Sequence, residues 1–409
     1  MFILYFIATT LLSPFLLIYW GFNKEKRGEI GERLGFGGWN FFINRKKKDV
    51  IWFHAASVGE LNGIKSLIYK VKTNNPILIT VTSSAARLIA REISEHSYFL
   101  PIDHPLFIGR IHKLVNPKAI IITETELWPA FIKAAKAPII LVNARISDKT
   151  LPRYKKLSFL LRSILNKFTL ILTQTERDRE RFLLLGSAQE KTKFIGNTKY
   201  DQVLKSPDEE INKKFSSKNI ITFASIRDDE YQQIIEYISK FNLESNYQYI
   251  IAPRHKQYFS DVYTYAKSKG LSTIKWSEAK NSQHLLTSNW NIFIIDTIGD
   301  LISFYPISKI VFVGGTLNNT GGHNILEPAQ FNLPILFGPS FSNYLEPGND
   351  LLSSENAKIV DSYESFKEAV IFFENKQKIN SVEVFNKYLG ATKEVLNELK
   401  KYLALDKSS

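Results

Sequence analysis

Short apolar runs alternate with longer amphipathic stretches from residue 50 nearly to the end of the chain. This alternation is typical of parallel sheets covered by helices, because strands buried on both faces read as continuous apolar runs. We expect strands at residues 50–55, 77–82, 119–123, 139–143, 170–174 and 193–197, and then at 219–225, 247–253, 291–296, 309–315 and 334–338. The pattern predicts an α/β fold with two doubly wound sheets in tandem.

The first twenty residues contain no charged side chain and are followed at once by Lys24, Lys26 and Arg27. About 20 apolar residues can span a bilayer, and basic residues directly after them favour a cytoplasmic position for the rest of the chain. A signal peptide fits less well, because the positive start and a small-residue cleavage site are missing. We therefore predict a membrane anchor over residues 1–20, and Pro14 leaves an interfacial helix as the other form.

The polar segment from Ser206 to Asn219 separates the two sets of strands and is interpreted as a linker leading into a second domain. The domains are then residues 21–205 and 206–409, with an amphipathic helix expected between Glu383 and Asp406. In doubly wound sheets, ligands bind beyond the carboxyl ends of the strands. Function is therefore expected where strands end, in a cleft between the two sheets.

Charge is distributed unevenly over these halves. Residues 1–205 carry 32 Lys and Arg against 16 Asp and Glu, whereas residues 206–409 carry 21 against 24. A basic first half suggests a polyanionic partner for that half alone, such as anionic lipid, a phosphorylated substrate or nucleic acid. The chain has no cysteine, which excludes disulfides, thiolate nucleophiles and thiolate-bound zinc.

Glu60 follows the strand that ends in the small residues Ala55, Ala56 and Ser57. Ser57 and Glu60 have the spacing of a helix capping box, which would give Glu60 a purely structural role. Alternatively, Glu60 faces the cleft as a proton acceptor; both accounts can hold, because a helix N-terminus keeps a carboxylate ionised. His54, inside the strand, is interpreted as an interior histidine.

Two further strand ends of the first half carry candidate residues. Glu124 and Glu126 flank one threonine in TETELWP, where they either serve the start of the next helix or face the cleft. Alternate residues point in different directions, so at most one of them need serve the helix. Lys199 and Asp201 follow the last strand in NTKYD, where a lysine is more often simply solvated.

Strand ends in the second half carry phosphate-binding chemistry. Arg254 and His255 follow one strand and suit a phosphate, which arginine binds through a bidentate fork. Ile298, Gly299 and Asp300 precede a predicted helix, where backbone amides are available.

The stretch KIVFVGGTLNNTGGHNILEPA is the most informative of the second half. Two glycine pairs, the second being Gly321 and Gly322, precede His323, Asn324 and a helix with Glu327 in its first turn. Glycines before a helix start bring amides to an anion, and a carboxylate one turn later suits the two hydroxyls of a ribose. The stretch is neither a P-loop nor a dinucleotide fingerprint, which argues against ATP hydrolysis and simple dinucleotide binding.

Together, HAASVGE, TETELWP, GNTKYD, APRH, DTIGDL and GGHNILEPA, in this order, resemble the bacterial Kdo (3-deoxy-D-manno-octulosonic acid) transferases. The resemblance runs from about Lys24 to about Pro339. It departs from the family after the strand NIITFAS, where Ser-x-His is expected and the chain has Ser225, Ile226 and Arg227. No contact of that histidine is carried over to this chain, and Arg227 can also meet an anion.

The resemblance implies a GT-B fold of two Rossmann-like domains, the first for a lipid acceptor and the second for a nucleotide-sugar donor. It also implies inverting transfer of Kdo from CMP-Kdo to a lipid A precursor (lipid IVA) at the cytoplasmic face of the inner membrane. CMP-Kdo is then a co-substrate, and neither a further cofactor, nor a metal, nor a nucleic-acid partner is expected.

Residue roles follow from the matched motifs. The resemblance makes Glu60 the general base, and Glu124 and Lys199 the stabilisers of the transition state. It places CMP contacts at Pro253, Arg254, Ile298, Gly299, Asp300, Asn324, Ile325, Leu326 and Glu327. Further donor contacts are expected at Ser225, Arg227, His255, Gly321 and Gly322.

Two other functions stay open from the sequence. One is a GT-B membrane glycosyltransferase that uses a UDP-sugar, and the other is a membrane-anchored protein that binds anionic lipid or nucleic acid without catalysis. The number of Kdo residues transferred, the acyl-chain preference and the oligomeric state depend on shapes that no motif encodes.

Overall fold

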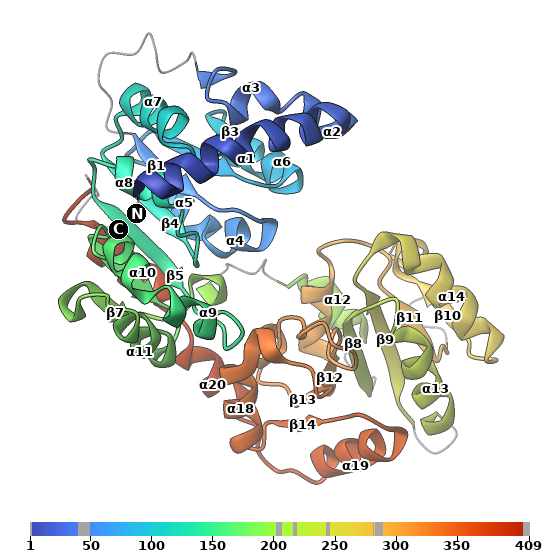
Figure 1. Ribbon diagram of the computed structural model, residues 1–409. Helices are drawn as coiled ribbons and strands as arrows, with labels where there is room; N and C mark the ends of the chain where they lie inside the picture. Colours follow the sequence, from blue (N-terminus) through green and yellow to red (C-terminus); the bar gives the residue numbers. More distant parts are fainter. Residues whose placement is uncertain are drawn as a thin grey trace. The chain divides into compact units, whose positions relative to one another are not determined.

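A computed structural model describes residues 2–39, 50–201, 207–215, 219–242, 246–280, 282 and 289–403 (Figure 1). The chain forms two compact units. Unit 1 contains residues 1–203 and 389–409, and unit 2 contains residues 204–388.

Unit 1 contains a parallel sheet of seven strands in the order β3-β2-β1-β4-β5-β6-β7. The strands are β1 Ile51–His54, β2 Ile77–Val81, β3 Ser97–Phe99, β4 Ala119–Thr123, β5 Ile139–Ala144, β6 Leu170–Thr173 and β7 Thr192–Phe194. All six strands predicted in this half are confirmed. The prediction missed the edge strand β3.

Helices precede the sheet of unit 1 and connect its strands. They are α1 Phe2–Phe22, α2 Lys24–Arg27, α3 Ile30–Arg33, α4 Val58–Gly63, α5 Lys65–Lys72, α6 Ser84–Ile93, α7 Pro105–Val115, α8 Pro129–Ala134, α9 Leu151–Lys156, α10 Ser158–Leu165, α11 Glu176–Leu184, η2 Gln189–Lys191 and η3 Thr198–Asp201. Successive residues of β1 enter opposite cores: Trp52 packs in one hydrophobic cluster, and Ile51 and Phe53 pack in the other. The sheet is therefore covered on both faces, as a doubly wound fold requires.

Unit 2 contains a second parallel sheet of seven strands, in the order β10-β11-β9-β8-β12-β13-β14. The strands are β8 Ile220–Ile226, β9 Gln248–Pro253, β10 Thr273–Lys275, β11 Ile292–Ile294, β12 Ile310–Val313, β13 Ile335–Phe337 and β14 Ala357–Ile359. The five predicted strands are confirmed, and the prediction missed the three-residue edge strands β10 and β14.

The helices of unit 2 are α12 Glu209–Phe215, α13 Tyr231–Phe241, η4 Lys256–Tyr258, α14 Phe259–Ser268, α15 Trp276–Ala279, η5 Leu301–Ile307, α17 Leu326–Ala329, η6 Ser342–Tyr344, α18 Leu345–Ser353, α19 Tyr363–Glu374 and α20 Ser381–Lys387. Helix α12 lies inside the segment interpreted as a linker. Its Phe215 is fully buried against Trp290, Phe293 and Phe304. Most of that segment is therefore the start of unit 2, because α12 supplies part of its core.

The C-terminal helix corrects the predicted domain boundary. Residues 389–409 were expected to belong to the second domain, but α21 Ala391–Leu399 packs its Val395, Leu396 and Leu399 into a core of unit 1. The expected single helix is two helices, because Gly390 has φ +99° between α20 and α21. Asp201 holds the start of α21 by accepting the amides of Gly390 and Thr392, at 2.6 and 2.5 Å.

Helix α1 confirms the predicted N-terminal helix and lies against the rest of unit 1 (Figure 1). The Tyr5 hydroxyl donates to Asp103 Oδ2 at 2.5 Å, and the Thr10 hydroxyl lies 2.9 Å from His104 Nε2. Near the other end of the helix, the Arg33 guanidinium lies over the Trp20 ring. Residues 5–22 are long and apolar enough to cross a membrane, by length and composition.

In each sheet, a reversal of the strand order beside the first strand, β1 or β8, places the site. In unit 1 it lies between β1 and β4, and in unit 2 between β8 and β12. Ligands of doubly wound sheets bind beyond the carboxyl ends of the strands at this switch point. The segments that follow β1, β4, β8 and β12 are therefore where binding and chemistry are expected.

Candidate active site

Glu60 lies in the first turn of α4, directly beyond β1. Its Oε2 accepts from the Ala56 amide at 2.8 Å and from the Thr123 hydroxyl at 3.0 Å, and its Oε1 accepts from the Ser57 hydroxyl at 3.0 Å. Ser57 in turn caps α4 by accepting the Glu60 amide at 3.3 Å. The capping account is therefore confirmed, and the side chain also reaches β4 across the switch point. The role of Glu60 as a proton acceptor stays a prediction.

Glu124 directly follows β4, beside Glu60. Its backbone is left-handed, with φ +52°, and its amide donates to the Val142 carbonyl at 2.9 Å. A non-glycine residue held there costs free energy and is concentrated at functional sites. Burial raises the pKa of Glu124, the Glu60 carboxylate raises it further, and Arg145 and Lys199 oppose that shift. The structure therefore brings Glu60, Glu124 and Lys199 into one electrostatic group.

Glu126 also raises the pKa of Glu124, but its carboxylate has other partners. Its Oε2 accepts from Trp128 Nε1 at 2.6 Å and lies 3.7 Å from His54 Nε2. His54 is fully buried and its Nδ1 contacts the Thr80 hydroxyl at 3.0 Å, which agrees with an interior histidine. The helix-start account of the two glutamates is wrong, because α8 begins only at Pro129 and has no acidic residue in its first turn.

Lys199 lies on η3, after β7. Burial and the neighbouring Arg145 lower its pKa from 10.5 to about 8, against the attraction of Glu124. The account of Lys199 as a simply solvated lysine is therefore wrong. A half-buried cation beside a carboxylate of raised pKa is typical of a functional site.

A network of buried amides and hydroxyls fixes the backbone at Lys199. The Thr198 hydroxyl donates to the Gly63 carbonyl at 2.6 Å and accepts from Asn143 Nδ2 at 2.9 Å. Asn143 Oδ1 accepts the Thr198 amide at 3.0 Å, and Gln174 Nε2 donates to the Asn143 carbonyl at 2.9 Å. Asn143 has φ +54° and lies where the register of β5 shifts, so a bulge turns it toward η3.

The sequence analysis missed Thr123, Asn143, Arg145 and Thr198. Each stands at or beside a strand end, so the signal that selected Glu124 and Lys199 was present for them as well. What the sequence did not show was the bulge in β5 and the proximity of η3 to α4.

In unit 2, Glu327 lies at the start of α17, where its carboxylate accepts from Asn324 Nδ2 and from the Tyr305 hydroxyl, both at 3.3 Å. Burial raises the pKa of Glu327, and Arg254 opposes the shift. Asn324 also caps the Leu326 amide at 3.1 Å. Asn324, Glu327 and Arg254 are thus brought together, and Tyr305 is a neighbour that the sequence did not indicate.

Arg254 and Arg227 stand at neighbouring strand ends, since the Arg254 amide donates to the Ile226 carbonyl at 2.8 Å. Burial, together with the positive charges of Arg254, Arg227 and His255, lowers the pKa of His323 from 6.5 to about 4. Arg227 also faces Asp229 at 3.6 Å. Arg227, which stands where the family pattern has histidine, therefore belongs to a cluster of basic side chains suited to an anion.

The segment Ile298 to Asp300 precedes η5, which carries Tyr305. Ile298 is exposed and Gly299 has φ +92°. The Asp300 carboxylate accepts from Thr297 at 2.6 Å and from Trp276 Nε1 at 2.9 Å, so it already has partners inside the unit.

The glycine-rich turn differs from the expectation that its amides face an anion from outside the chain. The Gly321 amide donates to Ser340 Oγ at 3.1 Å, and the Gly322 amide donates to the Gly315 carbonyl at 2.7 Å. Contacts of Ser225, Pro253, Gly321, Gly322, Ile325 and Leu326 with a donor stay predictions.

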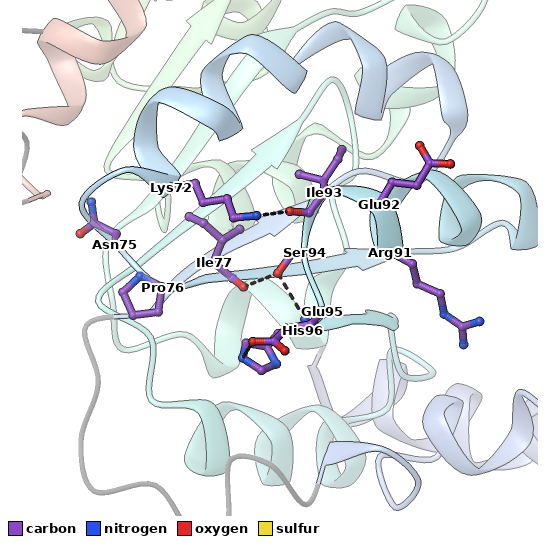
Figure 2. Close-up of a pocket in the computed structure, with 10 residues that line it drawn as sticks. All are labelled: Lys72, Asn75, Pro76, Ile77, Arg91, Glu92, Ile93, Ser94, Glu95 and His96. Carbon is purple, nitrogen blue, oxygen red and sulfur yellow. Dashed lines mark hydrogen bonds and ion pairs between the residues drawn. The ribbon is translucent and has the colours of Figure 1, made fainter.

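Unit 1 contains a hollow of about 460 Å³. Figure 2 shows the residues that line it. It lies beside Lys72 at the end of α5, Ile77 at the start of β2, and the segment 93–96 after α6. The Lys72 ammonium donates to the Ile93 carbonyl at 2.5 Å, and Ser94 donates to the Ile77 carbonyl at 3.0 Å. Because the amino end of β2 borders it, this hollow is separate from the site at the carboxyl ends.

Within the part of the chain that the structure describes, no group of three or more histidine and acidic side chains is placed to hold a metal ion. The absence of a metal from the reaction stays a prediction.

The chain is similar to several known proteins. Residues 28–202 match a family described as 3-deoxy-D-manno-octulosonic-acid transferase (kdotransferase). A 3-deoxy-D-manno-octulosonic acid transferase of Haemophilus influenzae is 30% identical over 97% of this chain and 98% of its own length. A bifunctional glycosyltransferase/methyltransferase of Fusobacterium nucleatum is 32% identical over 97% of this chain, which spans 62% of that protein. The solved structure of S. aureus MnaA with UDP has the same fold, with a TM-score of 0.57 and 19% identity over 88% of this chain and 98% of that one.

Proposed function

This chain belongs to the 3-deoxy-D-manno-octulosonic acid (Kdo) transferase family, and on that premise we propose that it transfers Kdo from CMP-Kdo to a hydroxyl of a lipid A precursor. The observation that carries this proposal is the group of Glu60, Glu124 and Lys199 at the switch point of unit 1. A proton acceptor, a second carboxylate and a cation there are what hydroxyl attack on a sugar requires.

Glu60 acts as the general base in the proposed reaction. All three partners of the Glu60 side chain donate hydrogen bonds to it, as they would to a carboxylate. A carboxylate oxygen can accept two hydrogen bonds, and Oε1 accepts one, from Ser57. Glu60 takes the proton of the glucosamine hydroxyl as this oxygen attacks the anomeric carbon of Kdo. The carbon–oxygen bond to CMP breaks on the opposite side, and a single displacement inverts the anomeric centre.

Lys199 and Glu124 act on the charge that moves in this step. The Lys199 ammonium balances the Kdo carboxylate or the phosphate of departing CMP. The Glu124 carboxylate keeps Lys199 charged at neutral pH, because it opposes the fall of the lysine pKa. One phosphate leaves with CMP, so basic side chains can balance it without a metal.

Unit 2 binds the donor in this proposal. Glu327, positioned by Asn324 and Tyr305, accepts the hydroxyls of the cytidine ribose. Arg254, with Arg227 beside it, binds the phosphate. The basic surplus of the first half then serves a phosphorylated lipid at the membrane.

Membrane attachment is proposed through α1. The residues of α1 that face unit 1 include the polar Tyr5, Thr9 and Ser13, whereas the large side chains that α1 exposes are mainly apolar: Ile7, Leu11, Leu12, Phe15, Leu16, Ile18, Tyr19 and Phe22. A helix that exposes this many apolar side chains requires an apolar partner. Since contacts with unit 1 run from Tyr5 to Trp20, we propose that α1 lies in the plane of the cytoplasmic leaflet of the inner membrane.

The test is product analysis with the purified full-length protein in detergent. Incubation with CMP-Kdo and a tetraacylated lipid A precursor should give an acceptor heavier by one or more Kdo residues by mass spectrometry. A thermal-shift titration should show stabilisation by CMP and not by UDP. Stabilisation by UDP alone, with no Kdo product, would replace this proposal with transfer from a UDP-sugar.

A further inference from the structure

Two turns meet at the switch point of unit 2, and one carboxylate joins them. The first turn, residues 227–230, follows β8, and the second, residues 314–317, follows β12. Glu230 ends the first turn and precedes α13. Its side chain has 0% exposure, so the carboxylate is fully removed from solvent.

The Glu230 carboxylate accepts four backbone amides. Oε2 accepts from Gly315 at 2.7 Å and from Arg227 at 3.0 Å. Oε1 accepts from Thr316 and Leu317, both at 2.9 Å. Three of these amides belong to the second turn, residues 314–317, which we call the glycine turn. They converge as amides do around a bound phosphate.

The turn is built for this close approach. A Cβ on Gly314 would lie 2.9 Å from Glu230 Oε2 and 2.7 Å from the Ser225 carbonyl, so only glycine fits there. Gly315 has φ +72°, and a Cβ on it would lie 2.8 Å from the His323 ring. The His323 amide donates to the Gly314 carbonyl at 3.1 Å. The position of the turn therefore determines the position of His323.

We infer that Glu230 is a positioning residue of the donor site, which occupies the amide nest of the glycine turn as a built-in anion and keeps that turn formed before any donor binds. The same carboxylate fixes the backbone of Arg227, so one side chain aligns both Arg227 and His323. This role in donor binding rests on the proposed function of unit 2. The donor phosphate must then bind to the basic side chains rather than to the amides of residues 315–317.

The first test uses hydrogen exchange of the unliganded full-length protein. The amides of residues 315–317 should exchange at least about a hundredfold more slowly than unstructured amides without any nucleotide, because they are buried and bonded. Exchange at the unstructured rate would overturn the inference. This readout requires no activity, so its outcome is independent of whether Kdo is the sugar transferred.

The second test compares Glu230→Gln with a matched control, Glu236→Gln. Glu236 lies on the same helix, is exposed and pairs with Lys269 at 3.4 Å, so the control removes an equal charge without touching the turn. In Glu230→Gln the side-chain NH2 group replaces one carboxylate oxygen and must face at least one backbone N–H. Two donors then meet, and at least one hydrogen bond is lost. The KM for CMP-Kdo and the Kd for CMP should rise about tenfold or more, with the acceptor KM unchanged and faster exchange at residues 315–317.

Two outcomes of the variant experiment contradict the inference. One is unchanged CMP affinity with a lower kcat, which would mean a loss of active protein rather than a donor site out of position. The other is an equal rise of the donor KM in Glu236→Gln, which would assign the effect to charge alone. If Glu230→Gln does not fold, the inference is tested by hydrogen exchange at residues 315–317 of the unchanged protein.

Discussion

Replacing Lys199 with methionine should abolish transfer and yet stabilise the folded protein. Burial and Arg145 lower the pKa of Lys199 from 10.5 to about 8, so the folded protein holds this charge at a cost. The difference corresponds to about 3 kcal/mol, which is an upper limit because the side chain keeps some solvent contact. Methionine fills a similar volume without the charge.

The pH dependence of this effect has a definite sign. Below pH 8 the lysine is protonated in both the folded and the unfolded state, so the unchanged protein bears the full cost. Between pH 8 and 10.5 the folded state loses its proton first, so stability rises with pH. The advantage of Lys199→Met should therefore be greatest at pH 7 and mostly gone at pH 10.

This pH dependence is measured by denaturant unfolding of the unchanged protein and of Lys199→Met at pH 7 and pH 10. The other titrating groups are the same in both proteins, so their contributions cancel in the difference between the two free energies of unfolding. Lys70→Met is the matched control, since Lys70 is an exposed lysine of α5. It should change stability by no more than about 0.5 kcal/mol at either pH. If Lys199→Met were less stable at pH 7, or if its effect did not change with pH, the assignment of a costly functional charge to Lys199 would be wrong.

Two further predictions concern Thr198 and the exposed side of α1. Thr198→Val should lower kcat about tenfold or more while leaving CMP affinity unchanged, because the lost bonds to Gly63 and Asn143 misplace Lys199; an unchanged kcat would dissociate this network from catalysis. Changing Leu12 and Phe15 to glutamate should abolish flotation with anionic vesicles, since each buried apolar side chain contributes about 2 kcal/mol; retained flotation would place the membrane contact elsewhere.

The fold was predictable because its information is local. Each strand longer than three residues left an apolar run, and every run that was singled out is a strand. The edge strands β3, β10 and β14 were missed. Length alone does not explain this, because β7, β11 and β13 also have three residues and were predicted. The destination of α21 was not predictable either, because its apolar side fits any core and its place depends on the contact with Asp201.

The site was predictable where a motif names the residue, and less so where a distant contact defines it. Glu60, Glu124 and Lys199 were selected from strand ends and resemblance, and the structure groups them. Glu230 was not singled out from the sequence. Its role depends on amides 85 to 87 residues away in the chain, which no local pattern shows.

The role of Glu60 as the base is tested most directly by measuring turnover and CMP affinity of Glu60→Gln beside Ser57→Ala. Ser57→Ala removes the helix cap and one bond to the carboxylate but keeps the base, so it should cost about 1 kcal/mol of stability and leave turnover within about tenfold. Glu60→Gln should retain CMP affinity and lose turnover by a factor of about 100 to 10,000. Turnover of Glu60→Gln equal to that of Ser57→Ala would show that Glu60 only caps its helix, and would contradict its role as the base.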